Sequence, residues 1–260
     1  MRRTVHAEWT KLRTVPSTAW LVLAAVGATV VVAAVAVSSV DVEHCPPAGC
    51  VQDIPKLSLT GVWLAQAAVA VLAVLAVTNE YGTGMIHTTL AAIPRRGLVL
   101  AGKAVAVTAA VLPAAALGVL GALAAGRAIP PGNGYAPANG YPLLSLADEA
   151  TRRAAAGTAL YLGLVALLGL GLGMIIRDTA GAITAVLTLL YVSPVIAGLI
   201  TDPDWREWLQ RVSPTAGLSV QATEGLDALP IGPWAGLGVL AGYAGGALLL
   251  GLVAVRLRDA

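Results

Sequence analysis

The sequence predicts an all-α membrane protein that forms a single domain, residues 1–260, with six transmembrane helices. Of its 260 residues, 57% are hydrophobic and only 12% are charged, so the chain is more apolar than a soluble domain of this size needs to be. The apolar residues also occur in long runs, and a helix needs about 20 of them to cross roughly 30 Å of hydrocarbon. Six runs reach that length: 19–40, 57–78, 98–126, 154–176, 179–200 and 231–255.

The distribution of lysine and arginine predicts that both termini are cytoplasmic, because cytoplasmic segments of membrane proteins are enriched in these residues. With the N-terminus inside, the inner segments contain Arg2, Arg3, Lys11, Arg13, Arg95, Arg96, Lys103, Arg177, Arg256 and Arg258. The outer segments then contain the smaller set Lys56, Arg127, Arg152, Arg153, Arg206 and Arg211. We therefore expect a multi-pass protein of the cell (cytoplasmic) membrane. Its net charge of +2 is divided between the two sides and does not indicate a nucleic-acid partner.

Residues 1–18 predict an interfacial helix on the cytoplasmic surface of the lipid bilayer. Val5, Trp9 and Leu12 recur at helical spacing, and Pro16 interrupts the pattern. Charged residues occupy the other faces of this helix. The residues that we assign to the interfacial helix are Glu8, Trp9, Lys11, Leu12 and Arg13.

The first outer loop contains the two cysteines of the chain, Cys45 and Cys50. An oxidising exterior favours a disulfide between them, which would contribute on the order of 2 kcal/mol through the entropy of closing the loop. Two free thiols are the alternative. A metal site is the weaker hypothesis, because His44 is the only histidine beside them and a tetrahedral site needs further ligands.

Residues 201–230 predict an outer element that returns toward the membrane. Trp205, Trp208, Leu209 and Val212 recur at helical spacing among charged residues, and Pro214 ends the pattern. This spacing is typical of an amphipathic helix. We expect the element to be re-entrant, with Trp205, Trp208 and Pro214 as its characteristic residues.

The sequence lacks the residues that catalysis or nucleotide binding would need. The segment 97–104 imitates a phosphate-binding loop, but Ala104 replaces the Ser or Thr that would hold magnesium, and the segment opens a membrane span. The histidines fall on different loops, so they form no metal cluster. Lys103 lies near the inner end of its span, where its side chain can snorkel to the surface. We expect no catalytic residue, no metal and no cofactor bound by this chain.

The inner segment after the second span predicts a short amphipathic helix. Met85, Ile86, Leu90 and Ile93 form its apolar face, and Pro94 ends it. Such a helix could simply lie on the membrane surface. Glu80 and Tyr81 at its entrance, with Arg95 and Arg96 at its exit, favour an element that docks a partner.

Two motifs resemble the type-2 ABC exporter permease family, and in particular its actinobacterial-type members. The first is Glu8-Trp9-Thr10-Lys11-Leu12-Arg13 before the first span. The second is the more specific one, and it runs from Asn79-Glu80-Tyr81-Gly82-Thr83-Gly84-Met85-Ile86 through Thr89-Leu90 to Pro94-Arg95-Arg96. The six-span layout extends the resemblance over essentially the whole chain. Cys45 and Cys50 are not part of the family pattern.

The resemblance implies a transmembrane subunit that pairs with a separately encoded ATPase, two permeases and two ATPases forming one transporter. ATP and Mg²⁺ would then bind to the partner, and the permeases would form a homodimer or a heterodimer. Segment 83–93 would be the coupling helix, Arg3–Val15 the interfacial helix beside it, and 201–225 the re-entrant element. The residues expected to dock the ATPase, or to set the geometry of docking, are Glu80, Tyr81, Gly84, Met85, Ile86, Leu90, Arg95 and Arg96.

The leading hypothesis is therefore the permease subunit of an ABC exporter that moves an amphipathic or hydrophobic substrate. Two alternatives remain open. One is a membrane scaffold or immunity protein that binds a partner without transport. The other, disfavoured by the missing acid–base and metal groups, is a self-sufficient membrane enzyme. The hydroxyl groups scattered along the spans do not distinguish drugs, lipids or hydrophobic peptides as cargo.

Overall fold

The computed structural model describes residues 2–40, 52–92, 96–139 and 141–258, and within these ranges the chain forms helices and no strand. Six helices are long and apolar enough to cross a membrane: α2 (Pro16–Ser38), α4 (Val62–Gly82), α6 (Arg96–Ala128), α7 (Glu149–Ile176), α8 (Thr179–Leu199) and α10 (Pro233–Arg258). The prediction of an all-α protein with six apolar spans is confirmed. The shorter α-helices are α1 (Arg2–Thr14), α3 (Ile54–Ser58), α5 (Met85–Ala92) and α9 (Pro203–Val212). The 3₁₀ turns are η2 (Pro130–Asn133), η3 (Pro137–Asn139), η4 (Pro214–Gln221) and η5 (Leu226–Ala228).

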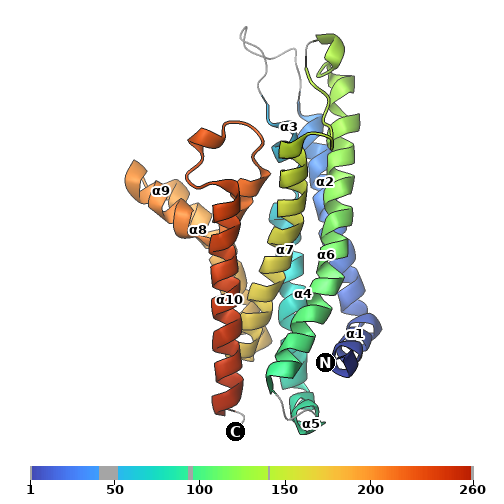
Figure 1. The fold of residues 1–260 in the computed structure, drawn as a ribbon, viewed down its shortest axis with the longest axis vertical. Coiled ribbons are helices and arrows are strands. Elements are labelled where there is room, and N and C mark those ends of the chain that lie inside the picture. The colour runs from blue at the N-terminus through green and yellow to red at the C-terminus, as the bar shows by residue number, and fades with distance from the viewer. Residues whose placement is uncertain (1, 41–51, 93–95, 140, 259–260) are drawn as a thin grey trace.

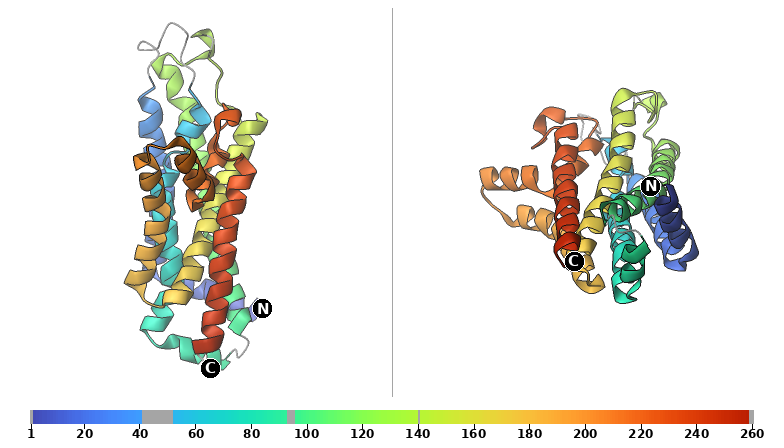
Figure 2. Two further views of the ribbon diagram at one scale, coloured as in Figure 1. Left: turned by 90° about the vertical axis from the view of Figure 1, so that its left-hand side faces the viewer. Right: turned by 60° about the horizontal axis from the view of Figure 1, so that its bottom comes forward.

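The long helices run side by side in one elongated bundle, with both termini and α5 at the same end (Figure 1). We call this the termini end. Figure 2 shows that α4 and α7 lie inside the bundle, and they are also the most buried of the six, whereas α2 and α8 are the least buried. The main core joins α4, α6, α7, α8 and α10, and a smaller core around Leu59, Leu123 and Tyr135 lies at the opposite end.

The starts of two spans differ from the prediction by five residues. The second span does not begin at residue 57, because the chain first forms α3 and then turns at Leu59–Gly61 before α4 begins. The fourth span begins earlier than residue 154, at Glu149, because the Asp148 carboxylate accepts a hydrogen bond from the Thr151 N–H and caps the helix. Local capping thus extends α7 beyond the strictly apolar run.

The turn at Gly61 brings the backbones of α2 and α4 into direct contact. A Cβ atom at this position would lie 2.4 Å from the Thr29 carbonyl oxygen and 2.8 Å from that of Ala28. The backbone of Gly61 is in the ordinary right-handed helical region (φ −58°, ψ −18°), so the restriction is steric and does not arise from an unusual φ. Glycine allows this approach because it lacks a Cβ.

The outer segment 201–230 divides into two parts with different surroundings. The predicted amphipathic helix is present as α9, which has no buried residue and points away from the bundle (Figure 1). Its Trp205 and Trp208 rings form an edge-to-face pair with centroids 5.8 Å apart, and both are exposed. The chain then returns into the bundle at η4, where Pro214 is buried and Gly217 contacts the Tyr161 ring. The second part is buried among the spans, whereas α9 contacts α8 and α10 without burying any of its residues.

Asp53 ties α3 to the segment after η4. Its carboxylate accepts hydrogen bonds from the Lys56 N–H (2.9 Å), the Thr223 N–H (2.6 Å), the Thr223 hydroxyl (2.7 Å) and the Glu224 N–H (3.1 Å). The Asp53 side chain therefore caps α3 and also links α3 to the segment after η4, at the end of the bundle opposite the termini.

We expect Asp53→Ala to lower the free energy of unfolding by about 1–3 kcal/mol, because it removes a helix cap and leaves Thr223 without its acceptor. Thermal unfolding of the purified protein in detergent would measure this loss. Asp227→Ala is the matched control, since Asp227 is an exposed carboxylate on η5. Equal melting temperatures for the two variants would contradict the prediction.

Candidate functional site

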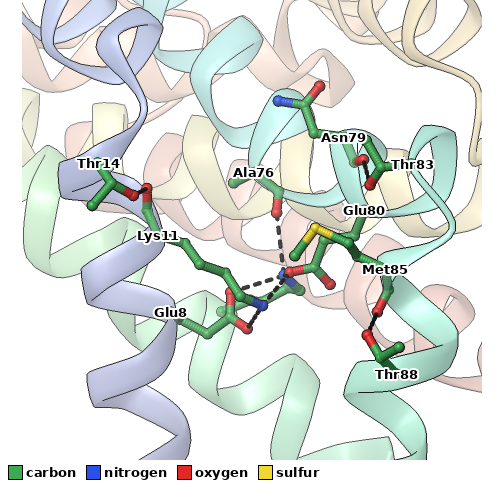
Figure 3. Close-up of polar contacts among 10 residues, drawn as sticks. Glu8, Lys11, Thr14, Ala76, Asn79, Glu80, Thr83, Met85 and Thr88 are labelled. Carbon is green, nitrogen blue, oxygen red and sulfur yellow. Dashed lines mark hydrogen bonds and ion pairs between the residues drawn. The ribbon is translucent and has the colours of Figure 1, made fainter.

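Four charged side chains from three helices meet inside the termini end of the bundle (Figure 3). Glu8 and Lys11 lie on α1, Glu80 lies in the last turn of α4, and Lys103 lies on α6. Glu8 and Lys11 are three residues apart, so they project from the same face of α1. We call these four residues the charge cluster.

The charge cluster is connected by short ion pairs that alternate in sign. Lys103 Nζ lies 2.8 Å from Glu8 Oε2 and 2.6 Å from Glu80 Oε1, and it also donates to the Ala76 carbonyl oxygen at 3.2 Å. Lys11 Nζ lies 3.1 Å from Glu8 Oε1 and 2.6 Å from Glu80 Oε1. Each ammonium group therefore bridges both carboxylates, and the cluster joins α1, α4 and α6.

The cluster is buried, and its formal charges cancel. The side chain of Lys103 is only 2% exposed and those of Glu8 and Glu80 are 7% and 6% exposed, whereas Lys11 is 34% exposed and faces the open side. Burying a charge is costly unless it is paired, and two carboxylates with two ammonium groups satisfy that condition. The expectation that Lys103 snorkels to the surface is therefore wrong: its ammonium group finds two carboxylates inside the protein.

The pKa of Lys11 is raised above its usual value. Burial acts to lower this pKa, but the hydrogen bonds to the Glu80 and Glu8 carboxylates act in the opposite direction and prevail. Lys11 therefore remains a cation at neutral pH, as the alternating charges of the cluster require.

A cavity of about 320 Å³ lies beside the charge cluster, between α1, α2, α4 and α6. All four cluster residues line it, and most of its remaining wall is apolar, with Leu21 on α2 and Leu72 and Leu75 on α4. Glu80 Oε2 is buried and accepts no hydrogen bond from any residue that the structure describes. The cavity is thus mostly apolar and is bounded on one side by the charge cluster.

The short helix α5 begins at the predicted position. Gly84 adopts a left-handed conformation (φ 70°) that turns the chain from α4 into α5, and this backbone favours glycine. Met85 is 46% exposed, whereas Ile86 is 5% exposed and faces inward. The side chain of Leu90, like Arg95 as a whole, lies outside the described part. Of the predicted docking residues whose burial is described, Gly84 and Met85 therefore lie on the surface, and Met85 is the one that presents an apolar side chain.

The other predicted docking residues are engaged within the bundle. Glu80 belongs to the charge cluster, and Tyr81 lies under the Arg177 guanidinium, whose carbon is 5.0 Å from the ring centroid. Arg96 donates to the carbonyl oxygens of Val255 (2.8 Å) and Arg256 (3.0 Å), at the end of α10. These side chains can set the geometry of α5, but they do not form an exposed docking face.

The N-terminal segment predicted to be helical forms α1, and its residues divide between two surroundings. Glu8 and Lys11 turn inward to the charge cluster, and Leu12 packs against the main core. Trp9 is half-buried and Arg13 is exposed. Helix α1 is therefore fastened to the bundle by charge pairing as well as by apolar contact.

Sequence reasoning missed the charge cluster, although the sequence contained a signal for it. A lysine inside an apolar span needs a partner, and Glu8 and Glu80 were both assigned to the same side of the membrane as Lys103. Cys45 and Cys50 lie outside the described residues, so their pairing stays a prediction. Within the described ranges, no group of three His, Cys, Asp or Glu side chains is arranged to hold a metal ion.

Comparison with known proteins adds no relative. No protein-family model matches the sequence, and no curated protein matches it.

Proposed function

We propose that this chain is the membrane-spanning subunit of an ATP-driven ABC exporter, which moves an amphipathic or hydrophobic substrate across the cytoplasmic membrane. The energy would come from a separately encoded ATPase, and ATP and Mg²⁺ would bind to that partner. The proposal rests on the resemblance carried by segments 8–13 and 79–96, and six apolar helices are compatible with such a subunit.

The observation that supports this proposal best is the position of α5. This short helix connects α4 to α6 at the termini end, and it carries the exposed apolar side chain of Met85. An exposed methionine on a short connecting helix suits a contact with another protein, because its flexible thioether adapts to different surfaces. Helix α5 is thus the natural candidate for the coupling helix.

Movement of α5 would reach the membrane spans through covalent and ionic links. Helix α5 lies between α4 and α6 along the chain, and the charge cluster joins both of these helices to α1. In the proposed cycle, ATP binding to the ATPase pair would shift the permease between two arrangements of these helices, as in other ligand-driven population shifts. No residue of this chain would perform chemistry. Two copies, or this chain with a related permease, would form the transmembrane part.

We expect Met85→Asp combined with Leu90→Asp to abolish co-purification with the ATPase encoded beside this chain. A carboxylate placed in an apolar contact loses its hydration without gaining a partner. Association would be measured by affinity purification of the tagged permease from membranes in which both proteins are expressed.

Leu146→Asp is the control for this experiment, because Leu146 is 45% exposed, almost the same as Met85, and lies at the opposite end of the bundle. It should leave association unchanged. Full association of the Met85 and Leu90 double variant would refute the assignment of α5 as the docking helix.

Reconstitution distinguishes the alternatives. An exporter subunit should support ATP-dependent substrate movement in proteoliposomes that contain the ATPase. A scaffold or immunity protein would bind its partner but show no such movement. Turnover of a substrate by the isolated chain without nucleotide would instead indicate a self-sufficient membrane enzyme.

A further inference from the structure

We infer that α9 is a membrane-surface helix whose two tryptophans bind the headgroup region of the leaflet opposite the termini, so that the partner of this exposed helix is the lipid bilayer. In the orientation predicted from lysine and arginine, this is the outer leaflet. The contact between α9 and lipid does not depend on the proposed transport function.

Helix α9 presents one apolar face that the rest of the chain does not cover. The residues of this face recur at the spacing of one side of a helix, and they are Trp205, Trp208, Leu209 and Val212. Trp205 is 62% exposed and Trp208 is 54% exposed. Neither indole N–H donates a hydrogen bond to a residue that the structure describes. Tryptophan favours the membrane interface, because its ring is apolar and its N–H can bond to the polar headgroups.

The length of α8 sets the level of α9 in the membrane. Helix α8 has 21 residues, so at 1.5 Å per residue it is about 31 Å long, close to the thickness of the hydrocarbon, roughly 30 Å. It begins at the termini end with Asp178, an exposed carboxylate that accepts a hydrogen bond from the Gly181 N–H at 2.7 Å. A charged residue at the start of α8 marks one edge of the hydrocarbon. The end of α8 at Leu199 then lies at the opposite edge, and α9 begins there, at Pro203.

The surroundings of α9 in this plane are lipid. Figure 1 shows that α9 points away from the bundle, and α8, which precedes it, is one of the two least buried spans. The last turns of α8 expose Val195 (62%) and Leu199 (78%), and such side chains of a membrane span contact lipid. Helix α9 therefore continues a surface that already faces the bilayer.

Two arginines fix the direction of α9. Arg206 donates from Nε (3.0 Å) and Nη2 (2.8 Å) to the Ile200 carbonyl oxygen, just after α8. Arg211 donates from Nε to the Pro230 carbonyl oxygen at 2.7 Å, shortly before α10, and also pairs with Glu207. Rotation of α9 about its own axis would break these bonds. The charged groups therefore stay on the protein side and the polar side of the helix, and the tryptophan face keeps one direction.

The test measures tryptophan fluorescence of the full chain in phosphatidylcholine nanodiscs, with lipid brominated either near the headgroup or near the chain end. The emission of α9 is the difference between the unchanged chain and the variant with both Trp205→Phe and Trp208→Phe. We expect shallow bromine to quench this emission at least about twofold more than deep bromine or aqueous iodide, because a membrane-surface helix buries its apolar face about 5–10 Å into the boundary between headgroups and acyl chains.

Three outcomes would overturn the inference. Strongest quenching by iodide would show that α9 lies in water. Strongest quenching by deep bromine would show that it is inserted into the hydrocarbon. Protection from all three quenchers would show that a second copy of the chain covers the tryptophans.

Gln210→Trp, added to the variant without Trp205 and Trp208, is the matched control. Gln210 is exposed and lies two residues after Trp208, so it projects from the opposite side of α9. The added tryptophan should be quenched mainly by iodide. All substituted positions are exposed, and melting temperatures confirm that each variant is folded. Quenching by shallow bromine at position 210 equal to that of the natural tryptophans would contradict a lipid contact through the apolar face.

Discussion

Replacing Lys103 by methionine will lower the free energy of unfolding by about 3–5 kcal/mol, the cost of breaking a buried ion pair by removing one partner. Methionine retains most of the volume of the lysine stem, so the effect isolates the ammonium group. Without it, Glu8 Oε2 loses its partner, and Glu80 keeps only the half-exposed Lys11. Thermal unfolding in detergent, together with the yield of folded protein, measures the loss.

Lys11→Met is the matched control for the Lys103 variant. Lys11 contacts the same two carboxylates, but its side chain is 34% exposed, so water replaces part of its contribution and the loss should be clearly smaller. A second check restores neutrality: Lys103→Met combined with Glu8→Gln leaves the remaining carboxylate of Glu80 paired with Lys11 and should recover much of the lost stability. Equal losses for Lys103→Met and Lys11→Met would contradict the view that burial makes Lys103 the central member of the cluster.

Replacing Gly61 by alanine will destabilise the fold by about 3 kcal/mol, at the upper end of the cost of overpacking. The added Cβ would lie 2.4 Å from the Thr29 carbonyl oxygen and 2.8 Å from the Thr29 Cα. Both are backbone atoms of α2, so no side-chain rotation relieves the clash, and α2 and α4 must separate. The melting temperature in detergent reports the change.

The same substitution at Gly27 should have the opposite sign. Gly27 also lies on α2, and a Cβ there would meet no atom within 4 Å. Alanine at a helix interior is more favourable than glycine by up to about 1 kcal/mol, so Gly27→Ala should be neutral or slightly stabilising. A loss of stability at Gly27 equal to that at Gly61 would show that the close approach of α2 and α4 is not the cause.

Local sequence patterns predicted the helices well because they report properties of single segments. The six spans follow from apolar runs of sufficient length, and α1, α5 and α9 follow from helical spacing ended by a proline or a glycine turn. The errors lie at boundaries. The turn at Leu59–Gly61 delays the start of the second span, and the cap at Asp148 moves the start of the fourth span to an earlier residue.

The candidate site was predicted only in part. The amphipathic pattern of segment 85–93 identified α5 and the exposed Met85, but the same pattern could not show that Glu80 and Arg96 turn into the bundle. A charged residue near a helix end can face a partner protein or the interior of its own chain. Which of the two occurs depends on whether neighbouring helices supply opposite charges or hydrogen-bond partners for it. The Arg96 acceptors are at the end of α10, far along the chain, so no local signal could reveal them.

The sequence by itself determined that this protein is all-helical and crosses a membrane, because hydrophobicity, run length and helical spacing are properties of consecutive residues. Only the tertiary structure decided which charged side chains are buried and which of them form ion pairs with one another. Glu8, Glu80 and Lys103 meet because α1, α4 and α6 pack together at one end of the bundle, and burial leaves each charge no alternative to pairing. The lysine that the sequence placed at the membrane surface is therefore the buried centre of the site.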